Sequence, residues 1–160
     1  MILLILISPE ARKDSKNRMD NLKNEHLAGA DSLTLAKAAV YVLIEKKAID
    51  VKLYNVSEDS SITDFYVNAT GRSSTNVASL ADEVTYKLGL SGREELRVEG
   101  RAGNSWILVD YGDVIVNIFD RESRDFYNFD RLLPESSLTD ISDVIKEVDK
   151  KYNINNKEED

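Results

Sequence analysis

The chain has 160 residues, 42% of them hydrophobic, which is enough for one ordinary domain with a substantial core and short tails. Because cysteine is absent and His26 is the single histidine, disulfide scaffolds, thiolate zinc sites and histidine-based catalytic or metal sites lack their residues, and we expect no cofactor. The net charge of -8 argues against binding by wrapping nucleic-acid phosphates, so a basic protein surface is the better electrostatic match and RNA contact is at most peripheral.

Residues 1–30 are expected to form an N-terminal arm without a fold. Met1–Ile7 is apolar, but no positive region precedes it and no small-residue cleavage site follows it. It is also far shorter than the about 20 apolar residues that cross a bilayer, so we expect no membrane association. Met19 offers a second start, and residues 1–18 are therefore either an over-extended start or a disordered arm. The lack of cysteine fits a reducing cytoplasm, where we place the protein.

Residues 31–133 are expected to form the domain, and their pattern predicts alternating helices and strands. In chain order the expected elements are a helix from Asp31 to about Ala48, strands at 51–56 and 63–70, a helix from 73 or 74 to Gly89, a strand at 96–99 and a hairpin at 106–119. Arg121–Tyr127 is expected to form a short helical turn. This order predicts an α+β, or mixed α/β, fold in which helices pack on a mixed sheet. The strands before and after the second helix are expected to be a parallel, right-handed pair.

Residues 134–160 are expected to lie outside the domain as a C-terminal helix and a charged tail. The segment from Ser137 to Tyr152 has apolar residues at helical spacing, and the tail begins at Asn153.

The hairpin at residues 106–119 has two unlike faces. With Tyr111 and Gly112 as the turn, Asp110 is expected opposite Asp113. One face is wholly aliphatic and belongs in the core. The other combines aromatic, aliphatic, amide and acidic side chains: Trp106, Leu108, Asp110, Asp113, Ile115, Asn117 and Phe119. An aromatic patch with a polar rim is typical of a protein-docking surface, and a covering helix is the alternative.

Two further patterns are candidate sites for phosphate or metal chemistry. The turn from Thr70 to Ser74 precedes a helix and could bind an anion, but it lacks the glycines and lysine of a phosphate loop, which favours a serine-capped turn. Asp110 and Asp113 could hold a divalent metal, as paired carboxylates do in nucleotidyltransferases. They flank a turn instead of lying within an apolar strand, so metal-dependent phosphoryl transfer lacks its ligands.

The segment from Arg121 to Tyr127 has two interpretations. It could be a solvated turn whose local ion pairs contribute only about 0.5 kcal/mol each. Phe126, Tyr127 and Phe129 favour a larger role, because one aromatic side chain can reach the core while another stays at the surface.

Six colinear blocks between Asp31 and Leu133 closely resemble the ribosomal silencing factor family, also called Iojap-like. The blocks are Ser61–Val67, Ala69–Ser74, Ala81–Val84, Val98–Gly100, Trp106–Val116 and Arg124–Leu132. The resemblance implies a nucleotidyltransferase-like fold without the catalytic carboxylates. It also implies a non-enzymatic cytoplasmic factor that binds ribosomal protein L fourteen of the large subunit and sterically blocks joining of the small subunit.

The resemblance also implies which residues contact the partner. The family's aromatic contacts fall on Trp106 and Tyr127, and the acidic pair would face the basic ribosomal protein. The full set of expected partner-binding residues is Trp106, Leu108, Asp110, Asp113, Asn117, Phe119, Arg124 and Tyr127. Members usually carry histidine at the position of Asn117 and often an aromatic residue at that of Leu133, and this chain departs at both.

The most strongly indicated function is therefore translation repression by steric block. A nucleotide-binding or nucleotidyltransferase-like enzyme is the alternative, and a homodimer formed through the aromatic patch of the free protein is compatible with either.

Overall fold

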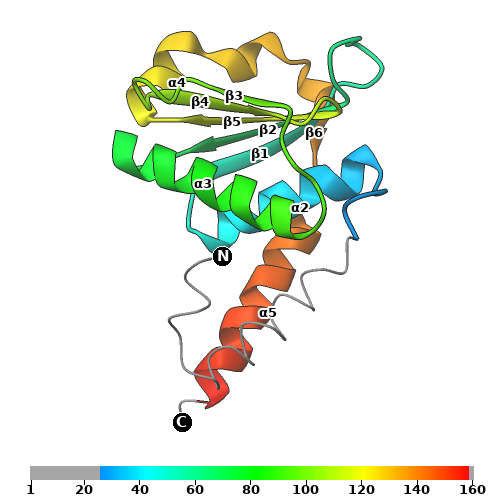
Figure 1. The fold of residues 1–160 in the computed structure, drawn as a ribbon, viewed down its shortest axis with the longest axis vertical. Helices are drawn as coiled ribbons and strands as arrows, with labels where there is room; N and C mark the ends of the chain where they lie inside the picture. Colours follow the sequence, from blue (N-terminus) through cyan, green and yellow to red (C-terminus); the bar gives the residue numbers. More distant parts are fainter. Residues whose placement is uncertain (1–25, 159–160) are drawn as a thin grey trace, which may run out of the picture.

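A six-stranded mixed sheet with helices on both faces is the framework of the protein (Figure 1). The computed structural model describes residues 26–158, so the expectations for residues 1–25 lie outside the described part. The strand order is β3-β4-β5-β2-β1-β6. The elements are α2 (Ser32–Glu45), β1 (Ile49–Asn55), β2 (Phe65–Thr70), α3 (Ser74–Leu90), β3 (Arg97–Glu99), β4 (Trp106–Asp110), β5 (Val114–Phe119), α4 (Arg121–Tyr127), η2 (Phe129–Leu132), η3 (Glu135–Ser137), β6 (Leu138–Thr139) and α5 (Ser142–Glu158). Because β2 and β5 are parallel and the other pairs antiparallel, the predicted mixed α+β class is confirmed.

The two long helices of the domain begin where the sequence places their caps. Asp31 Oδ1 accepts a hydrogen bond from the backbone N–H of Thr34 at 2.8 Å, at the start of α2. Ser73 Oγ accepts one from the N–H of Asn76 at 3.1 Å, at the start of α3. Each bond satisfies one of the N–H groups that a helix start leaves without an intrahelical partner. The capped turn after Thr70 is therefore the interpretation that the structure supports.

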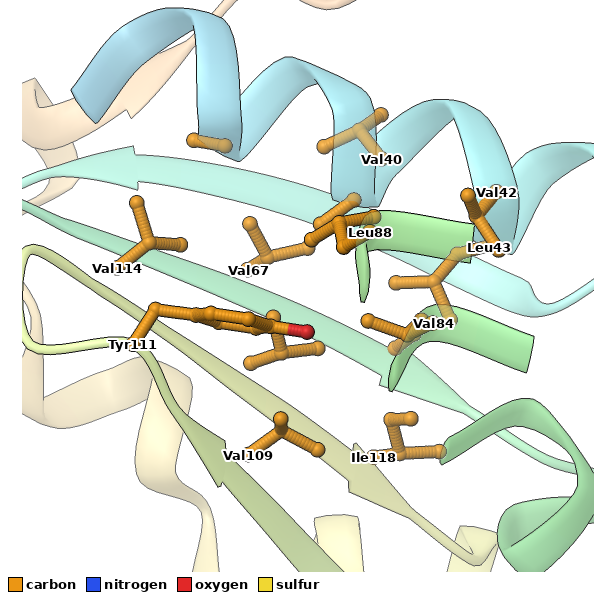
Figure 2. Packing of buried hydrophobic residues seen from close by; sticks show 14 of the residues in the cluster. Val40, Val42, Leu43, Val67, Val84, Leu88, Val109, Tyr111, Val114 and Ile118 are labelled. Carbon is orange, nitrogen blue, oxygen red and sulfur yellow. The ribbon is translucent and has the colours of Figure 1, made fainter. Parts of the chain in front are cut away.

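The core lies between the sheet and the pair α2 and α3. The aliphatic face of the hairpin is fully buried there: Ile107, Val109, Val114, Val116 and Ile118. Figure 2 shows Val109, Val114 and Ile118 on the sheet, together with Val67, pointing toward side chains of α2 and α3. The separation of the hairpin into an aliphatic core face and a second, mixed face is confirmed.

The expected pairing of the two hairpin strands is wrong by two residues. Asp110 lies opposite Ile115, and Trp106 lies opposite Phe119. The N–H of Tyr111 donates to the carbonyl of Val114 at 2.9 Å, so the central residues of the turn are those at 112 and 113. Gly112 has a φ of 87°, and a positive φ at the first central position is the pattern of the tight hairpin turn that needs glycine there. An offset of two keeps every side chain on its predicted face.

The strand that neighbours β2 also differs from the expectation. We expected β2 to pair with the strand after α3, but β3 lies at the sheet edge and pairs with β4. β2 pairs in parallel with β5 instead, along six residues from Phe65 to Thr70. All six residues of β5 are buried, whereas two of the three residues of β3 are exposed. A strand that is buried on both faces belongs in the middle of a sheet.

Both ends of the described chain belong to this same fold. Leu27 is buried, and its N–H donates to the carbonyl of Ser91 at 3.0 Å, so the fold begins before Asp31. The C-terminal segment adds β6, which pairs with β1, and α5, which packs against α2 through Val144 and Val148. The expected helix therefore begins at Ser142 and continues into the predicted tail, and residues 134–158 are not a separate appendage.

Candidate docking surface

Six aromatic side chains contact one another on the sheet face opposite α2 and α3, and we call them the aromatic cluster. They come from β2, β4, β5, α4 and η2, and are Tyr66, Trp106, Phe119, Phe126, Tyr127 and Phe129. Trp106 is central, because its ring centroid lies 4.8 Å from Phe119, 5.1 Å from Tyr127 and 6.0 Å from Phe129. These separations are typical of packed aromatic rings. The hairpin and α4 therefore build one common surface.

The exposure of the rings in the aromatic cluster increases from the core toward the solvent. Phe119 is fully buried and Trp106 half-buried, whereas Tyr127 is 53% exposed and Phe126 80% exposed. Leu132 of η2 adds a side chain that is 77% exposed. The covering-helix alternative is thus correct only in part: α4 lies over this face (Figure 1), yet it brings exposed aromatics of its own. Exposed apolar groups gathered above a packed aromatic base suit contact with another protein.

A line of polar side chains runs beneath the aromatic cluster. The indole Nε1–H of Trp106 donates to Asn117 Oδ1 at 3.0 Å, and Asn117 Nδ2 donates to Asn68 Oδ1 at 3.1 Å. Asn68 Nδ2 then donates to Asp130 Oδ1 at 3.0 Å. Asn68 and Asn117 are neighbours on the paired strands β2 and β5 and are fully buried. Buried amides of this kind are stable only when their donors and acceptors are paired, as they are here.

Asp130 is held as a carboxylate by the groups around it. Burial, the largest single contribution, opposes its ionisation, but hydrogen bonds from Arg124 and Asn68, the Arg124 charge and the Tyr54 hydroxyl together lower its pKa. The Arg124 guanidinium meets both carboxylate oxygens, with Nε 3.1 Å from Oδ2 and Nη2 3.2 Å from Oδ1. Nη1 also donates to Thr70 Oγ1 at 2.9 Å. Arg124 thus ties α4, η2 and the sheet together.

Asp110 and Asp113 do not face each other, contrary to expectation, and each already has a cationic partner within the chain. Arg97 Nε lies 3.1 Å from Asp110 Oδ2, and Arg93 Nη2 lies 2.6 Å from Asp113 Oδ1. The repulsion that would have called for a basic partner is therefore absent. A partner would have to compete with these internal arginines for the two carboxylates.

The structure separates the eight expected contact residues into two groups. Those at or near the surface are Trp106, Leu108, Asp110, Asp113 and Tyr127. Those beneath it are Asn117, Phe119 and Arg124, which are 1%, 0% and 7% exposed. Direct contact by the second group was expected, but these side chains have little or no exposed surface, so in this structure they support their neighbours.

Six residues of this surface are absent from the expected set. Phe126, Phe129 and Leu132 lie in an aromatic-rich segment, but their exposure could not be assigned before α4 and η2 were placed. Tyr66 lies on β2, whose place beside β5 was not predicted. Asn68 carried a usable signal, because it is an amide in the middle of an otherwise apolar strand. Asp130 carried none that distinguishes it from the many acidic residues of this chain.

The turn before α3 and the acidic side chains are the two places where the sequence suggests phosphate or metal chemistry. At the turn before α3, the N–H of Arg72 donates to Asn76 Oδ1, so this backbone group already has a partner within the chain. No group of three or more histidine and acidic side chains in residues 26–158 could hold a metal ion. Over the same range, every helix is too short or too polar to cross a membrane.

Comparison with known proteins identifies the family. The family model described as "Ribosomal silencing factor during starvation" matches residues 29–160. The chain belongs to the ribosomal silencing factor family. The silencing factor of Halalkalibacterium halodurans is 32% identical to this chain over 111 residues, which cover 69% of this chain and 95% of the relative. The silencing factor of Bacillus subtilis is 28% identical over 108 residues, which cover 68% of this chain and 92% of the relative. A crystal structure of a Chromobacterium violaceum protein has a TM-score of 0.63 and 31% identity, covering 65% of this chain and 87% of that one.

Membership in the ribosomal silencing factor family confirms the resemblance found in the six sequence blocks. The family's description names a factor that silences ribosomes, which is a regulatory role in translation. Its match extends over α5 as well as the sheet, in agreement with the packing of the C-terminal segment on α2.

Proposed function

We propose that this protein represses translation by binding the large ribosomal subunit and preventing the small subunit from joining. Membership in the ribosomal silencing factor family supports the ribosome as the target. The observation that carries the proposal is the aromatic cluster, which leaves Phe126 and Tyr127 in solvent on a face that no other described element covers completely. In a bacterium this activity takes place in the cytoplasm.

The proposed partner is ribosomal protein L fourteen, as the sequence resemblance implies. A net charge of -8 favours approach to a basic ribosomal surface and disfavours direct binding of RNA phosphates. Since Asp110 and Asp113 already pair with arginines of this chain, we assign affinity chiefly to the aromatic residues and only long-range attraction to the charge. The same cluster is available to a second copy when the protein is free.

Tyr127→Ala tests whether the aromatic cluster is the docking surface. Tyr127 is 53% exposed, so its removal should leave folding nearly unchanged, while loss of a central aromatic contact should weaken binding to isolated large subunits by about 2 kcal/mol or more. Trp106 is the less direct probe, because it packs on Phe119 and its removal also disturbs the fold. Co-sedimentation across a concentration series gives the affinity.

Tyr86→Ala is the matched control for this test. Tyr86 is a tyrosine of α3 on the opposite side of the sheet and is 65% exposed. Its removal should leave co-sedimentation unchanged. Equal losses for the two variants, or a loss for Tyr86→Ala alone, would show that the docking surface lies elsewhere.

A further inference from the structure

The hydrogen bonds beneath the aromatic cluster have one fixed direction. The indole N–H of Trp106 can only donate, and the ionised carboxylate of Asp130 can only accept. Between these two ends, each amide must present its oxygen toward Trp106 and its NH₂ toward Asp130, as the atoms of Asn117 and Asn68 do. The acceptor at one end therefore determines how every group along the line is turned.

Asp130 itself is held firmly at the other end of this line. Its Oδ1 accepts from Tyr54 Oη at 2.9 Å, in addition to Asn68 and Arg124. Arg124 in turn donates to the backbone carbonyl of Asp50 at 2.7 Å, at an irregularity in β1 where Asp50 has a φ of 49°. The carboxylate is thus held by four donor atoms, one each from Tyr54 and Asn68 of the sheet and two from Arg124 of α4, although it lies on the short helix η2.

We propose that Asp130 is a positioning residue for the docking surface, which through Asn68 and Asn117 holds the indole N–H of Trp106 turned inward. The outer part of the ring is then a purely apolar surface beside Tyr127. Without the inward acceptor, the partly buried indole N–H would lose its partner, and the ring would gain by turning its polar edge toward water. The effect on docking rests on the proposed function, whereas the orientation of the indole does not.

Trp106 is the single tryptophan of the chain, so its indole N–H gives one signal in a nitrogen-15 NMR spectrum and reports this orientation directly. Asn68→Leu removes the middle amide of the line and keeps a side chain of similar size. Asp130→Asn replaces a carboxylate, which can only accept, by an amide, which can also donate, so the direction of the hydrogen bonds is no longer fixed. Both variants should speed hydrogen exchange of the indole N–H about tenfold or more, because its hydrogen bond is no longer enforced. Asn68→Leu tests whether the line orients the indole, and Asp130→Asn tests whether Asp130 directs the line.

Asp143→Asn is the control for the removal of a carboxylate charge. Asp143 lies on α5, on the other side of the sheet (Figure 1), and its Oδ2 is 2.6 Å from Lys37 Nζ. Asp143→Asn should leave the indole signal as in the wild type. An indole signal that responds to neither Asn68→Leu nor Asp130→Asn overturns the proposal. A response to Asn68→Leu alone would also overturn it, because the amides would then act without Asp130.

A double-mutant comparison tests the consequence for docking. In the wild-type background, Asn68→Leu should weaken large-subunit binding about fivefold, whereas in a Trp106→Phe background, which has no N–H to orient, it should change binding less than twofold. Equal losses in both backgrounds would show that Asn68 acts through general destabilisation and would contradict the proposal. If the wild-type protein itself fails to bind, the proposed function is overturned, and the indole signal still decides whether Asp130 orients Trp106.

Discussion

At the scale of single residues, two buried tyrosines show how strongly the environment decides the contribution of one hydroxyl. Tyr54 is 5% exposed and donates to Asp130 at 2.9 Å. Tyr111 is 3% exposed, lies among the aliphatic side chains of the core (Figure 2), and its hydroxyl has no hydrogen-bond partner among the described residues. A buried polar group without a partner costs free energy, whereas a paired one stabilises the fold.

Tyr111→Phe should therefore leave the free energy of unfolding unchanged or raise it by about 1 kcal/mol, since it removes an unpaired hydroxyl and keeps the ring. Tyr54→Phe is the same chemical change at a paired hydroxyl, and it should lower the free energy of unfolding by about 1–2 kcal/mol. Urea denaturation of the three proteins measures both effects. A marked loss for Tyr111→Phe would mean that its hydroxyl has a partner in solution.

At the scale of the elements, Glu45 joins three helices. From α2 it lies 2.8 Å from Lys87 Nζ of α3 and 3.1 Å from Lys151 Nζ of α5, and its carbonyl accepts from Tyr152 Oη at 2.9 Å. Burial opposes ionisation of Glu45 most strongly of the separate effects, but the two lysines together outweigh it and lower its pKa. The ionised form of Glu45 therefore stabilises the packing of α5.

Glu45→Gln should lower the free energy of unfolding by about 1–2 kcal/mol at pH 7. Because the folded-state pKa lies below the unfolded value, this contribution is present above about pH 4.3 and is lost as the pH falls through the folded-state pKa. The wild type and the variant should thus converge in acid, as urea titrations between pH 3 and pH 7 would show. Glu147→Gln, at an exposed acid of α5 that has no ion pair among the described residues, should have little effect, and a pH-independent difference for Glu45→Gln would refute the ionic explanation.

Elements were predicted from the sequence where local chemistry decides them. Asp31 and Ser73 cap their helices as expected, and the two hairpin faces follow from alternation along residues 106–119. The neighbour of β2 and the strand β6 could not be found, because strand order depends on contacts between distant segments and β6 has only two residues. At the candidate site, Trp106 and Tyr127 were placed together through the family resemblance, but the inward role of Arg124 required the position of Asp130.

At the scale of the whole molecule, the sheet separates two surfaces with different tasks. The face that holds α2, α3 and α5 buries the aliphatic core and contains the ion pairs of Glu45 (Figure 1). The opposite face contains the aromatic cluster above the polar line that ends at Asp130. In the proposed function, one face maintains the fold while the other contacts the large subunit. Inhibition of subunit joining then requires only that the protein occupies the large subunit.

Subunit joining measured against the ratio of protein to large subunits tests this account most directly. A steric block acts stoichiometrically, so the fraction of large subunits that fail to join should follow the fraction occupied, at every time point and without added nucleotide. With the protein at about one tenth of the large-subunit concentration, joining should stay close to nine tenths of its uninhibited extent, as follows from one-to-one mass action. Progressive loss of joining toward completion at that ratio would contradict the account, because it would show that the protein modifies ribosomes catalytically.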